Sequence, residues 1–160
     1  EEALSVRLTD AQRPFLFPNA YVDYDADTRA VLWSYTVCAY AEADDADAVT
    51  EILYRYVADN IRYDQEKARA AAAGELGGYL PDVDETLDTG EGICFDYAAL
   101  LCCMLRAKRV PTRLITGYVG PGDEYHAWNA VYLDGEWTLR DATLDRDPRG
   151  DAAYTTDKAY

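Results

Sequence analysis

The chain has 160 residues, of which 49% are hydrophobic and 28% are charged, and its formal net charge is −15 at pH 7. This length fits one compact domain, and the composition is far from that of a disordered chain. No run of about 18 apolar residues exists that could span a bilayer. Phosphate backbones and anionic lipid surfaces repel so acidic a protein, so we exclude nucleic acid as a partner. The acidic residues are scattered among predicted turns and helix ends, which indicates a role in solubility.

The start of the chain and its cysteines say little about its compartment. Glu1 is not preceded by methionine or by a charged and then apolar leader, which suggests a trimmed or processed product. The four cysteines have no regular spacing, so they predict neither a disulfide framework nor, with a single histidine, a tetrahedral zinc site. We therefore expect no metal and no cofactor.

The first half of the chain is predicted to be helical. One helix is expected over Asp25–Glu42, and a second begins near Asp45, which can cap it. These two helices should form an antiparallel pair. A short alanine-rich helix follows over 64–73. The segment 77–92 carries glycines, Pro81 and five carboxylates without periodicity, so we predict a long surface loop there.

A helix without glycine or proline is predicted from Cys94 to Lys108. Its apolar residues occur nearly all the way round, with Asp96 and Arg106 as the main exceptions, so it should be a buried central helix.

Three strands are expected after this helix, over 112–119, 126–133 and 136–142. Asp134-Gly135 is a strong signal for a two-residue hairpin between the last two strands. Helices followed by an antiparallel sheet make the predicted fold class α+β. We expect one domain over 1–160, with a core at about 45–145 and an N-terminal helical extension over 1–44.

The hairpin turn also predicts the register of the sheet. If Leu133 lies opposite Glu136, counting along the ladder brings Trp128 opposite Asp141. His126 and Asp141 then share one face as diagonal neighbours, about 7–8 Å apart at the backbone. The same face carries the apolar side chains of the hairpin, so we predict that the central helix packs on it and that the other face is wet. Those apolar side chains are Trp128, Ala130, Tyr132, Trp137 and Leu139.

A thiol, an imidazole and a carboxylate follow one another as Cys94, His126 and Asp141. His126 is the only histidine of the chain, and an unperturbed imidazole is the side chain that changes charge near neutral pH. Cys94 is predicted in the first turn of the central helix, where the helix dipole favours a thiolate. Gly90 and Gly92 should leave room for a substrate carbonyl to approach, so that its oxyanion accepts the N–H of Cys94.

A structural interpretation stays open for each of the three residues. Cys94 could be a small buried hydrophobe, as we expect of the other three cysteines. His126 could be a hydrogen-bonded structural histidine. The role of Asp141 could fall to Asn129 or Asp145, although Asn129 projects from the other face in the predicted register.

Linked motifs in the correct order resemble the transglutaminase-like superfamily, of bacterial type, over about residues 45 to 145. The fold and the Cys-His-Asp order of that superfamily resemble those of papain-like cysteine proteases. The resemblance implies a central helix with the nucleophile Cys94 at its N-terminus, packed on an antiparallel sheet and preceded by a helical pair. It also implies that His126 is the general base and then the acid, and that Asp141 orients the imidazole. The motifs are 60–64, 92–98, Arg106, 110–113, 117–118, 126–128, Trp137 and 141–143.

Two further features of the family are a second oxyanion donor and, in its animal members, a calcium site. Its second oxyanion donor comes from a side chain upstream of the cysteine, for which Tyr79 is our only suggestion. A calcium loop is not predicted, because the segment beginning at Asp82 lacks glycine at its sixth position and has Ile93 at its twelfth.

The resulting functional expectation is acyl transfer at an amide carbonyl of a protein or peptide, through a thioester on Cys94. Resolution by water gives a protease or amidase, which we favour because an open acidic site is readily wetted, and resolution by an amine gives a transglutaminase. The alternative is an inactive transglutaminase-like module that binds peptides or surface ligands. The resemblance also implies an extracellular or cell-surface location. The sequence leaves the oligomeric state open.

Overall fold

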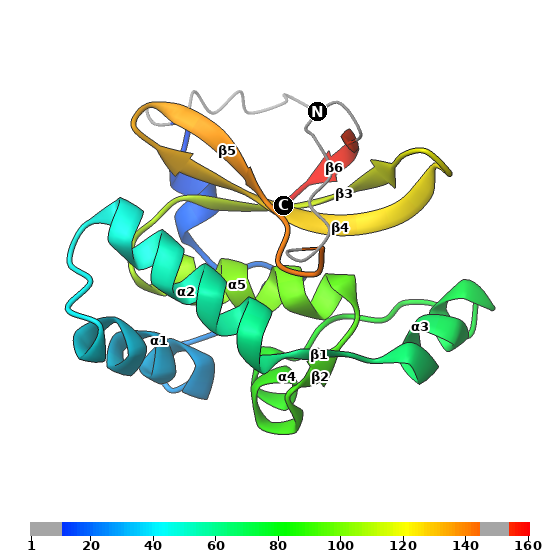
Figure 1. Ribbon diagram of the computed structural model, residues 1–160, viewed down its shortest axis with the longest axis horizontal. Coiled ribbons are helices and arrows are strands. Elements are labelled where there is room, and N and C mark those ends of the chain that lie inside the picture. Colours follow the sequence, from blue (N-terminus) through cyan, green and yellow to red (C-terminus); the bar gives the residue numbers. More distant parts are fainter. Residues whose placement is uncertain (1–10, 145–153) are drawn as a thin grey trace, which may run out of the picture.

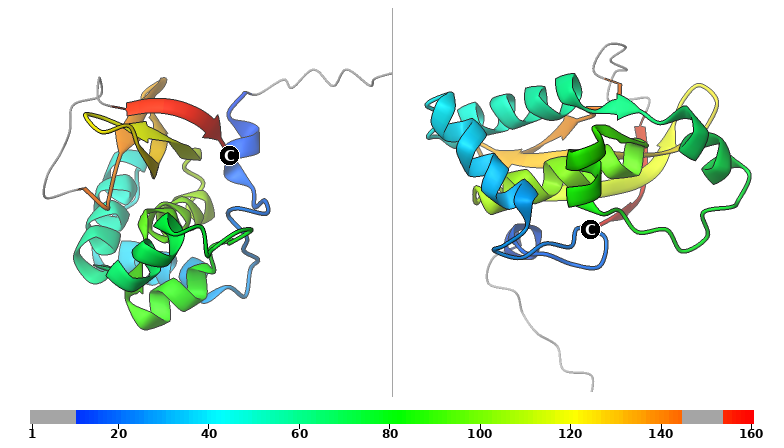
Figure 2. Two further views of the ribbon diagram at one scale, coloured as in Figure 1. Left: turned by 90° about the vertical axis from the view of Figure 1, so that its right-hand side faces the viewer. Right: turned by 90° about the horizontal axis from the view of Figure 1, so that it is seen from below.

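A four-stranded sheet covers a layer of helices in the computed structural model of the chain, which describes residues 11–144 and 154–160 (Figure 1). The strand order is β5-β4-β3-β6, and all three pairings are antiparallel. The views in Figure 2 show the α-helices gathered on one side of this sheet. The predicted α+β class is therefore confirmed. The elements are η1 (Arg13–Leu16), α1 (Arg29–Tyr40), α2 (Ala46–Asn60), β1 (Arg62–Tyr63), α3 (Gln65–Ala72), α4 (Val83–Thr89), β2 (Glu91–Gly92), α5 (Cys94–Ala107), β3 (Thr112–Val119), β4 (Glu124–Leu133), β5 (Glu136–Arg140) and β6 (Tyr154–Ala159).

The predicted helical pair is present as α1 and α2. The side chain of Asp45 accepts a hydrogen bond from the N–H of Ala48 at 2.8 Å, so it caps α2 as expected. The first helix begins later than predicted, at Arg29. The reason is local, because Asp25 and Thr28 hydrogen-bond to each other and form a turn that precedes the helix.

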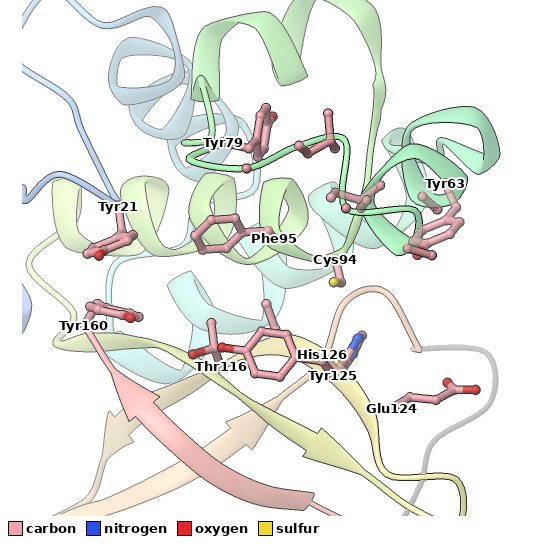
Figure 3. A pocket seen from close by; sticks show the side chains of 18 residues that line it. Tyr21, Tyr63, Tyr79, Cys94, Phe95, Thr116, Glu124, Tyr125, His126 and Tyr160 are labelled. Atoms are coloured by element: carbon pink, nitrogen blue, oxygen red, sulfur yellow. The ribbon is translucent and has the colours of Figure 1, made fainter.

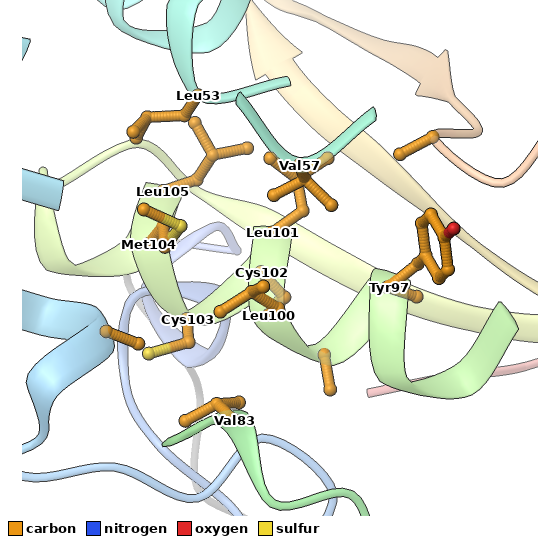
Figure 4. Close-up of a cluster of buried hydrophobic side chains, with 14 of the residues drawn as sticks. Leu53, Val57, Val83, Tyr97, Leu100, Leu101, Cys102, Cys103, Met104 and Leu105 are labelled. Atoms are coloured by element: carbon orange, nitrogen blue, oxygen red, sulfur yellow. The ribbon is translucent and has the colours of Figure 1, made fainter. Parts of the chain in front are cut away.

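The predicted loop over 77–92 contains a helix, so that prediction is wrong for its second half. Asp82 caps α4 by accepting from the N–H groups of Asp84 and Glu85, and Gly90 ends it with a left-handed φ of +64°. Val83 is 3% exposed and lies in the core beside α5 (Figure 4). A helix of seven residues is too short to show an apolar period, so its capping residues were the only signal.

The central helix α5 fills the interior as predicted. Most of its side chains are buried, and they meet α2, α4 and the sheet from different sides (Figure 4). Arg106 is only 2% exposed, and its guanidinium donates to the backbone oxygens of Thr112, Phe17 and Tyr160. This buried charge is satisfied by carbonyl groups and ties the C-terminal end of α5 to three separate segments.

The register of the hairpin is also as predicted. Leu133 lies opposite Glu136, and the ladder between β4 and β5 continues to the pair of Asn129 and Arg140. The strand β5 ends there, two residues earlier than predicted, so the expected pair of Trp128 and Asp141 lies just beyond the ladder. The strand β6, which the sequence did not suggest, pairs with β3 on the other side. Gly117 permits this pairing, because a Cβ at that position would lie 2.1 Å from the backbone oxygen of Thr155.

The predicted packing face of the sheet is wrong. The helix α5 packs on the face that carries Ala127, Asn129 and Val131, and the Asn129 side chain donates to the backbone oxygen of Ala98 in α5 at 2.9 Å. The face that carries Trp128 forms a second apolar cluster on the far side of the sheet. Its members are Ile115, Val119, Trp128, Ala130, Trp137, Leu139 and Tyr154.

Both faces of the sheet are thus covered, which explains the error. Phe15 of η1 packs edge-on against Trp137, with ring centroids 5.4 Å apart, and Arg113 lies over both rings. Tyr154 of β6 packs edge-on against Trp128 at 5.0 Å. The apolar pattern of the hairpin is satisfied by these segments, whereas the buried amide of Asn129 is tolerated because two carbonyl groups accept from it.

Candidate active site

Cys94 is the first residue of α5, as predicted, and the chain just before it is held by a short parallel pairing. The N–H of Arg62 donates to the oxygen of Gly90 at 2.7 Å, and the N–H of Asp64 donates to the oxygen of Gly92 at 2.9 Å. As the first helical residue, Cys94 has an N–H with no acceptor inside the helix. This N–H and the positive end of the helix dipole both favour an anion at this place.

Asp96 anchors the same end of α5. Its carboxylate is fully buried and accepts from the N–H of Ile93 at 2.9 Å, from the hydroxyl of Tyr79 and from Lys67, whose Nζ lies 3.0 Å away. A Cβ on Gly92 would lie 2.6 Å from the Cβ of Asp96. Gly92 is therefore needed for the close approach of Asp96, in addition to any room that it leaves for a substrate.

Tyr79, our suggestion for the second oxyanion donor, is occupied. Its hydroxyl donates to Asp96 and accepts from Lys67. Burial, and then the hydrogen bond to Asp96, raise the pKa of Tyr79 well above its usual range. The hydroxyl is thus part of a structural network, and the second donor is not assigned.

His126 and Asp141 meet as the register predicted. The Nε2 of His126 lies 2.8 Å from the Oδ2 of Asp141, and the exposed fractions of the two side chains are 12% and 5%. Three further groups hold Asp141 in place. The hydroxyl of Tyr154 donates to Oδ2 at 2.8 Å, the N–H of Leu144 donates to Oδ1 at 3.2 Å, and the hydroxyl of Tyr54 donates to the backbone oxygen at 3.3 Å.

The imidazole of His126 contacts Asp141 through Nε2 and also interacts with Cys94, whose sulfur lies close to the ring in Figure 3. Because side chains alternate along β4, the Cβ of His126 is on the face of the sheet away from α5. However, the ladder with β5 ends at Asn129, so the ring lies at an uncovered edge of β4 and reaches the thiol there. Burial disfavours the imidazolium, but the hydrogen bonds and negative charges of Asp141 and Cys94 outweigh it and raise the pKa of His126 to about 9. The raised pKa favours an imidazolium paired with Asp141 at neutral pH.

The other three cysteines lie in different surroundings. Cys38, Cys102 and Cys103 are at most 1% exposed, as expected for structural thiols. Burial raises the pKa of each of them, and that of Cys102 to about 11. Of the four thiols, only Cys94 lies beside an imidazole, and it is partly exposed.

A cavity of about 720 Å³ opens over Cys94 and His126 (Figure 3). Its walls come from the segment after α2, from α3 and the turn that follows it, from the start of α5, and from β3 and β4. Within the described part of the chain, no group of three or more His, Cys, Asp or Glu side chains could hold a metal ion, and no helix is long and apolar enough to cross a membrane.

The site has parts that the sequence did not reveal. Tyr154, whose hydroxyl donates to Asp141, lies in the strand β6, which was not predicted. Lys67 pairs with Asp96 from α3, a helix whose alanine content alone predicted it. Asn129, one alternative to Asp141, uses its amide to bind the backbone of α5 and β3. Asp145, the other alternative, lies outside the described residues.

Comparison of the sequence with known proteins identifies a family and several relatives. The profile of the transglutaminase-like superfamily matches residues 36–142. UPF0252 protein MJ1282 of Methanocaldococcus jannaschii is 29% identical over 103 residues, which cover 61% of this chain and 29% of that protein. Kyphoscoliosis peptidase of Mus musculus is 32% identical over 101 residues, which cover 57% of this chain and 14% of the peptidase. The chain spans less than a third of the length of these relatives.

Solved structures share the fold. A protein of Cytophaga hutchinsonii described as a candidate cysteine protease superposes with a TM-score of 0.69 at 20% identity, covering 96% of this chain and 48% of that one. The periplasmic domain of TgpA from Pseudomonas aeruginosa gives 0.59 at 19% identity, covering 83% and 48%. LapG of Legionella pneumophila gives 0.60 at 16% identity, covering 86% and 77%. At these identities the likeness concerns the fold alone.

Proposed function

Since the chain belongs to the transglutaminase-like superfamily, we propose that Cys94, His126 and Asp141 form a catalytic triad for acyl transfer at an amide carbonyl of a protein or peptide. The observation that carries this proposal is the imidazole of His126 held between a buried carboxylate and the one partly exposed thiol. A histidine with a purely structural role would be satisfied by the carboxylate alone, whereas a nucleophilic thiol requires an adjacent base.

The proposed reaction begins with attack of the Cys94 thiolate on the amide carbon. The carbonyl oxygen becomes an oxyanion, which accepts the N–H of Cys94. When the C–N bond breaks, the imidazolium of His126 gives its proton to the departing nitrogen, and a thioester remains on Cys94. His126, now neutral, takes a proton from the second nucleophile, whose attack on the thioester regenerates the thiolate. Asp141 keeps the ring oriented throughout.

We propose water as the second nucleophile, which makes the reaction a hydrolysis. The cavity opens to solvent beside Cys94, so water can reach a thioester formed there. An amine in the same place would give a transglutaminase instead. The decisive experiment is incubation of the protein with a peptide library and a labelled primary amine, followed by mass spectrometry. Backbone cleavage, conversion of a side-chain amide to an acid, and amine incorporation each select one reaction.

Thiol reactivity separates an enzyme from an inactive binding module. Iodoacetamide near pH 6 should modify Cys94 stoichiometrically, and the reaction should be lost in His126→Ala because the thiolate loses its imidazolium partner. The three buried cysteines are internal controls. Slow and equal labelling of all four cysteines would contradict an enzymatic role and favour the module.

The domain and its location are part of the same proposal. We propose a single domain over 1–160 with its core at about 45–145, located outside the cell or at its surface. The described segment 11–44 contributes Val22, Ala30 and Cys38 to the main core, which supports one folding unit. The periplasmic location of the TgpA domain supports the compartment. Cell fractionation of the native host and one cooperative unfolding transition are the tests.

A further inference from the structure

The cavity over Cys94 has an aromatic end. Tyr21 and Tyr160 face each other with ring centroids 4.0 Å apart, and Phe95, next to Cys94 in the sequence, lies 6.4 Å from Tyr21. All three side chains line the cavity and lie to one side of the sulfur (Figure 3). Such a surface gains most from contact with a large apolar or aromatic side chain.

The opposite end of the cavity is acidic. Glu124 lies beyond His126 on β4, on the other side of the sulfur from the aromatic end, together with Tyr63 (Figure 3). Among the described residues that line the cavity, Glu124 is the only acidic one, and neither lysine nor arginine occurs. Burial, followed by the negative charges of Cys94 and Glu124, raises the pKa of Tyr63. A carboxylate beside exposed tyrosine rings is a favourable place for an ammonium or guanidinium group.

Small side chains form another part of the cavity wall. Ala68, Ala71 and Ala72 lie on one face of α3 and line the cavity, as does Leu76 in the turn that follows. Each alanine adds only a methyl group to the wall, so a chain that crosses the sulfur has room to meet both the aromatic end and Glu124. The charge of −15 on the whole protein adds to the attraction of a basic ligand.

We propose that this cavity selects peptides that carry a large apolar or aromatic side chain on one side of the reacting amide and a lysine or arginine on the other. The inference rests on the proposed function, because it takes Cys94 as the point where the amide reacts. Tyr21, Phe95 and Tyr160 hold the apolar side chain, and Glu124 with Tyr63 holds the basic one.

The test measures binding without turnover, using Cys94→Ala and fluorescein-labelled peptides in an anisotropy titration. Four peptides of equal length share an Ala-Ala centre, with Phe or Ala on one side and Lys or Glu on the other, and each is made in both orientations. The Phe and Lys peptide should bind at least about tenfold more tightly than the Ala and Glu peptide, mainly through burial of the Phe ring. Equal binding of all four peptides overturns the inference.

Charge reversal assigns the basic end. In the Cys94→Ala background, Glu124→Lys should weaken binding of the Phe and Lys peptide about threefold to fivefold and leave the Phe and Glu peptide as tight or tighter. Glu136→Lys is the matched control, because Glu136 is exposed at the hairpin and is not among the cavity-lining residues. An equal loss in both variants would show only an effect of net charge and would overturn the assignment.

A bulky side chain on the exposed face of α3 tests the path over the sulfur. Ala71→Trp should weaken binding of the Phe and Lys peptide at least about tenfold, while iodoacetamide, which is small, still modifies Cys94 in the single variant. Unchanged peptide binding overturns the proposed path. If wild-type protein turns peptides over without the preference, the inference fails and the proposed function stands. If the preference holds but wild type never forms a thioester or product, the selective site stands and the proposed function fails.

Discussion

The two ends of α5 use the same residue types in different ways. At the N-terminal end, Cys94 is partly exposed beside an imidazole and Asp96 is buried among donors. At the C-terminal end, Cys102 and Cys103 are fully buried and Arg106 is surrounded by carbonyl groups. The buried charges match the helix dipole, negative at its start and positive at its finish. Position along one helix, rather than residue type, therefore separates the thiol that we propose to be reactive from the structural ones.

Replacing one cysteine at each end of α5 should give the largest difference in reaction rate. Cys94→Ala should lower the rate of acyl transfer by at least about 10⁴-fold, because the nucleophile is lost. Cys103→Ala removes a buried thiol of similar size and should keep the rate within about threefold. Steady-state turnover of the peptide found by the library experiment is the measurement. Comparable losses in both variants would contradict the distinction between the thiols.

Removal of the buried cation should have the next largest effect. Arg106→Met removes the guanidinium that donates to the carbonyl groups of Thr112, Phe17 and Tyr160, so the free energy of unfolding should fall by about 3–5 kcal/mol. Arg55→Met is the control, since Arg55 is exposed and pairs with Glu51 on the surface. It should change stability by less than about 0.5 kcal/mol. Urea unfolding followed by circular dichroism measures both. A change below about 1 kcal/mol in Arg106→Met would refute the stabilising role of the buried guanidinium at the C-terminal end of α5.

The buried anion at the other end should matter somewhat less, since Lys67 keeps some access to water. Asp96→Asn removes the partner of the Lys67 ammonium and one acceptor from the start of α5, so about 2–3 kcal/mol of stability should be lost. Adding Lys67→Met should restore part of the loss, because no unpaired charge then remains. Additive losses in the double variant, measured by the same urea unfolding, would mean that the two groups are not coupled.

The part of the pH dependence of stability that is lost in His126→Gln should report on the N-terminal end of α5. The folded pKa of His126, about 9, exceeds its unfolded value, so folding favours the protonated ring. This stabilisation is complete below about pH 6.5 and is lost as the pH rises through about 9, by at most about 3 kcal/mol. The difference in unfolding free energy between wild type and His126→Gln, measured from pH 6 to 9.5, isolates it from the titration of other groups. A difference that does not shrink with pH would exclude the raised pKa.

The elements that strong local signals specify could be predicted from the sequence. Asp134-Gly135 gave the hairpin register and with it the contact between His126 and Asp141, because a two-residue turn leaves only one pairing. The long uninterrupted run after Cys94 gave the central helix. These predictions depended on residues close together in the chain.

The remainder depended on contacts between distant segments. The face of the sheet that meets α5 could not be predicted, because the cover of Trp128 and Trp137 comes from η1 and β6. The network of Lys67 with Asp96 joins residues 29 positions apart, and no local pattern marks it. The cavity is lined by side chains from segments far apart in the sequence, so its composition could not be predicted without the fold.

Tyr160 contacts three parts of the molecule: the strand β3, the C-terminal end of α5 and the cavity. Its backbone exchanges two hydrogen bonds with Leu114, its carbonyl accepts from Arg106, and its ring forms part of the cavity wall. Displacement of this residue would therefore weaken the pairing of β3, leave the buried guanidinium of Arg106 with one acceptor fewer and widen the cavity in one event. Stability and the shape of the cavity would then change together.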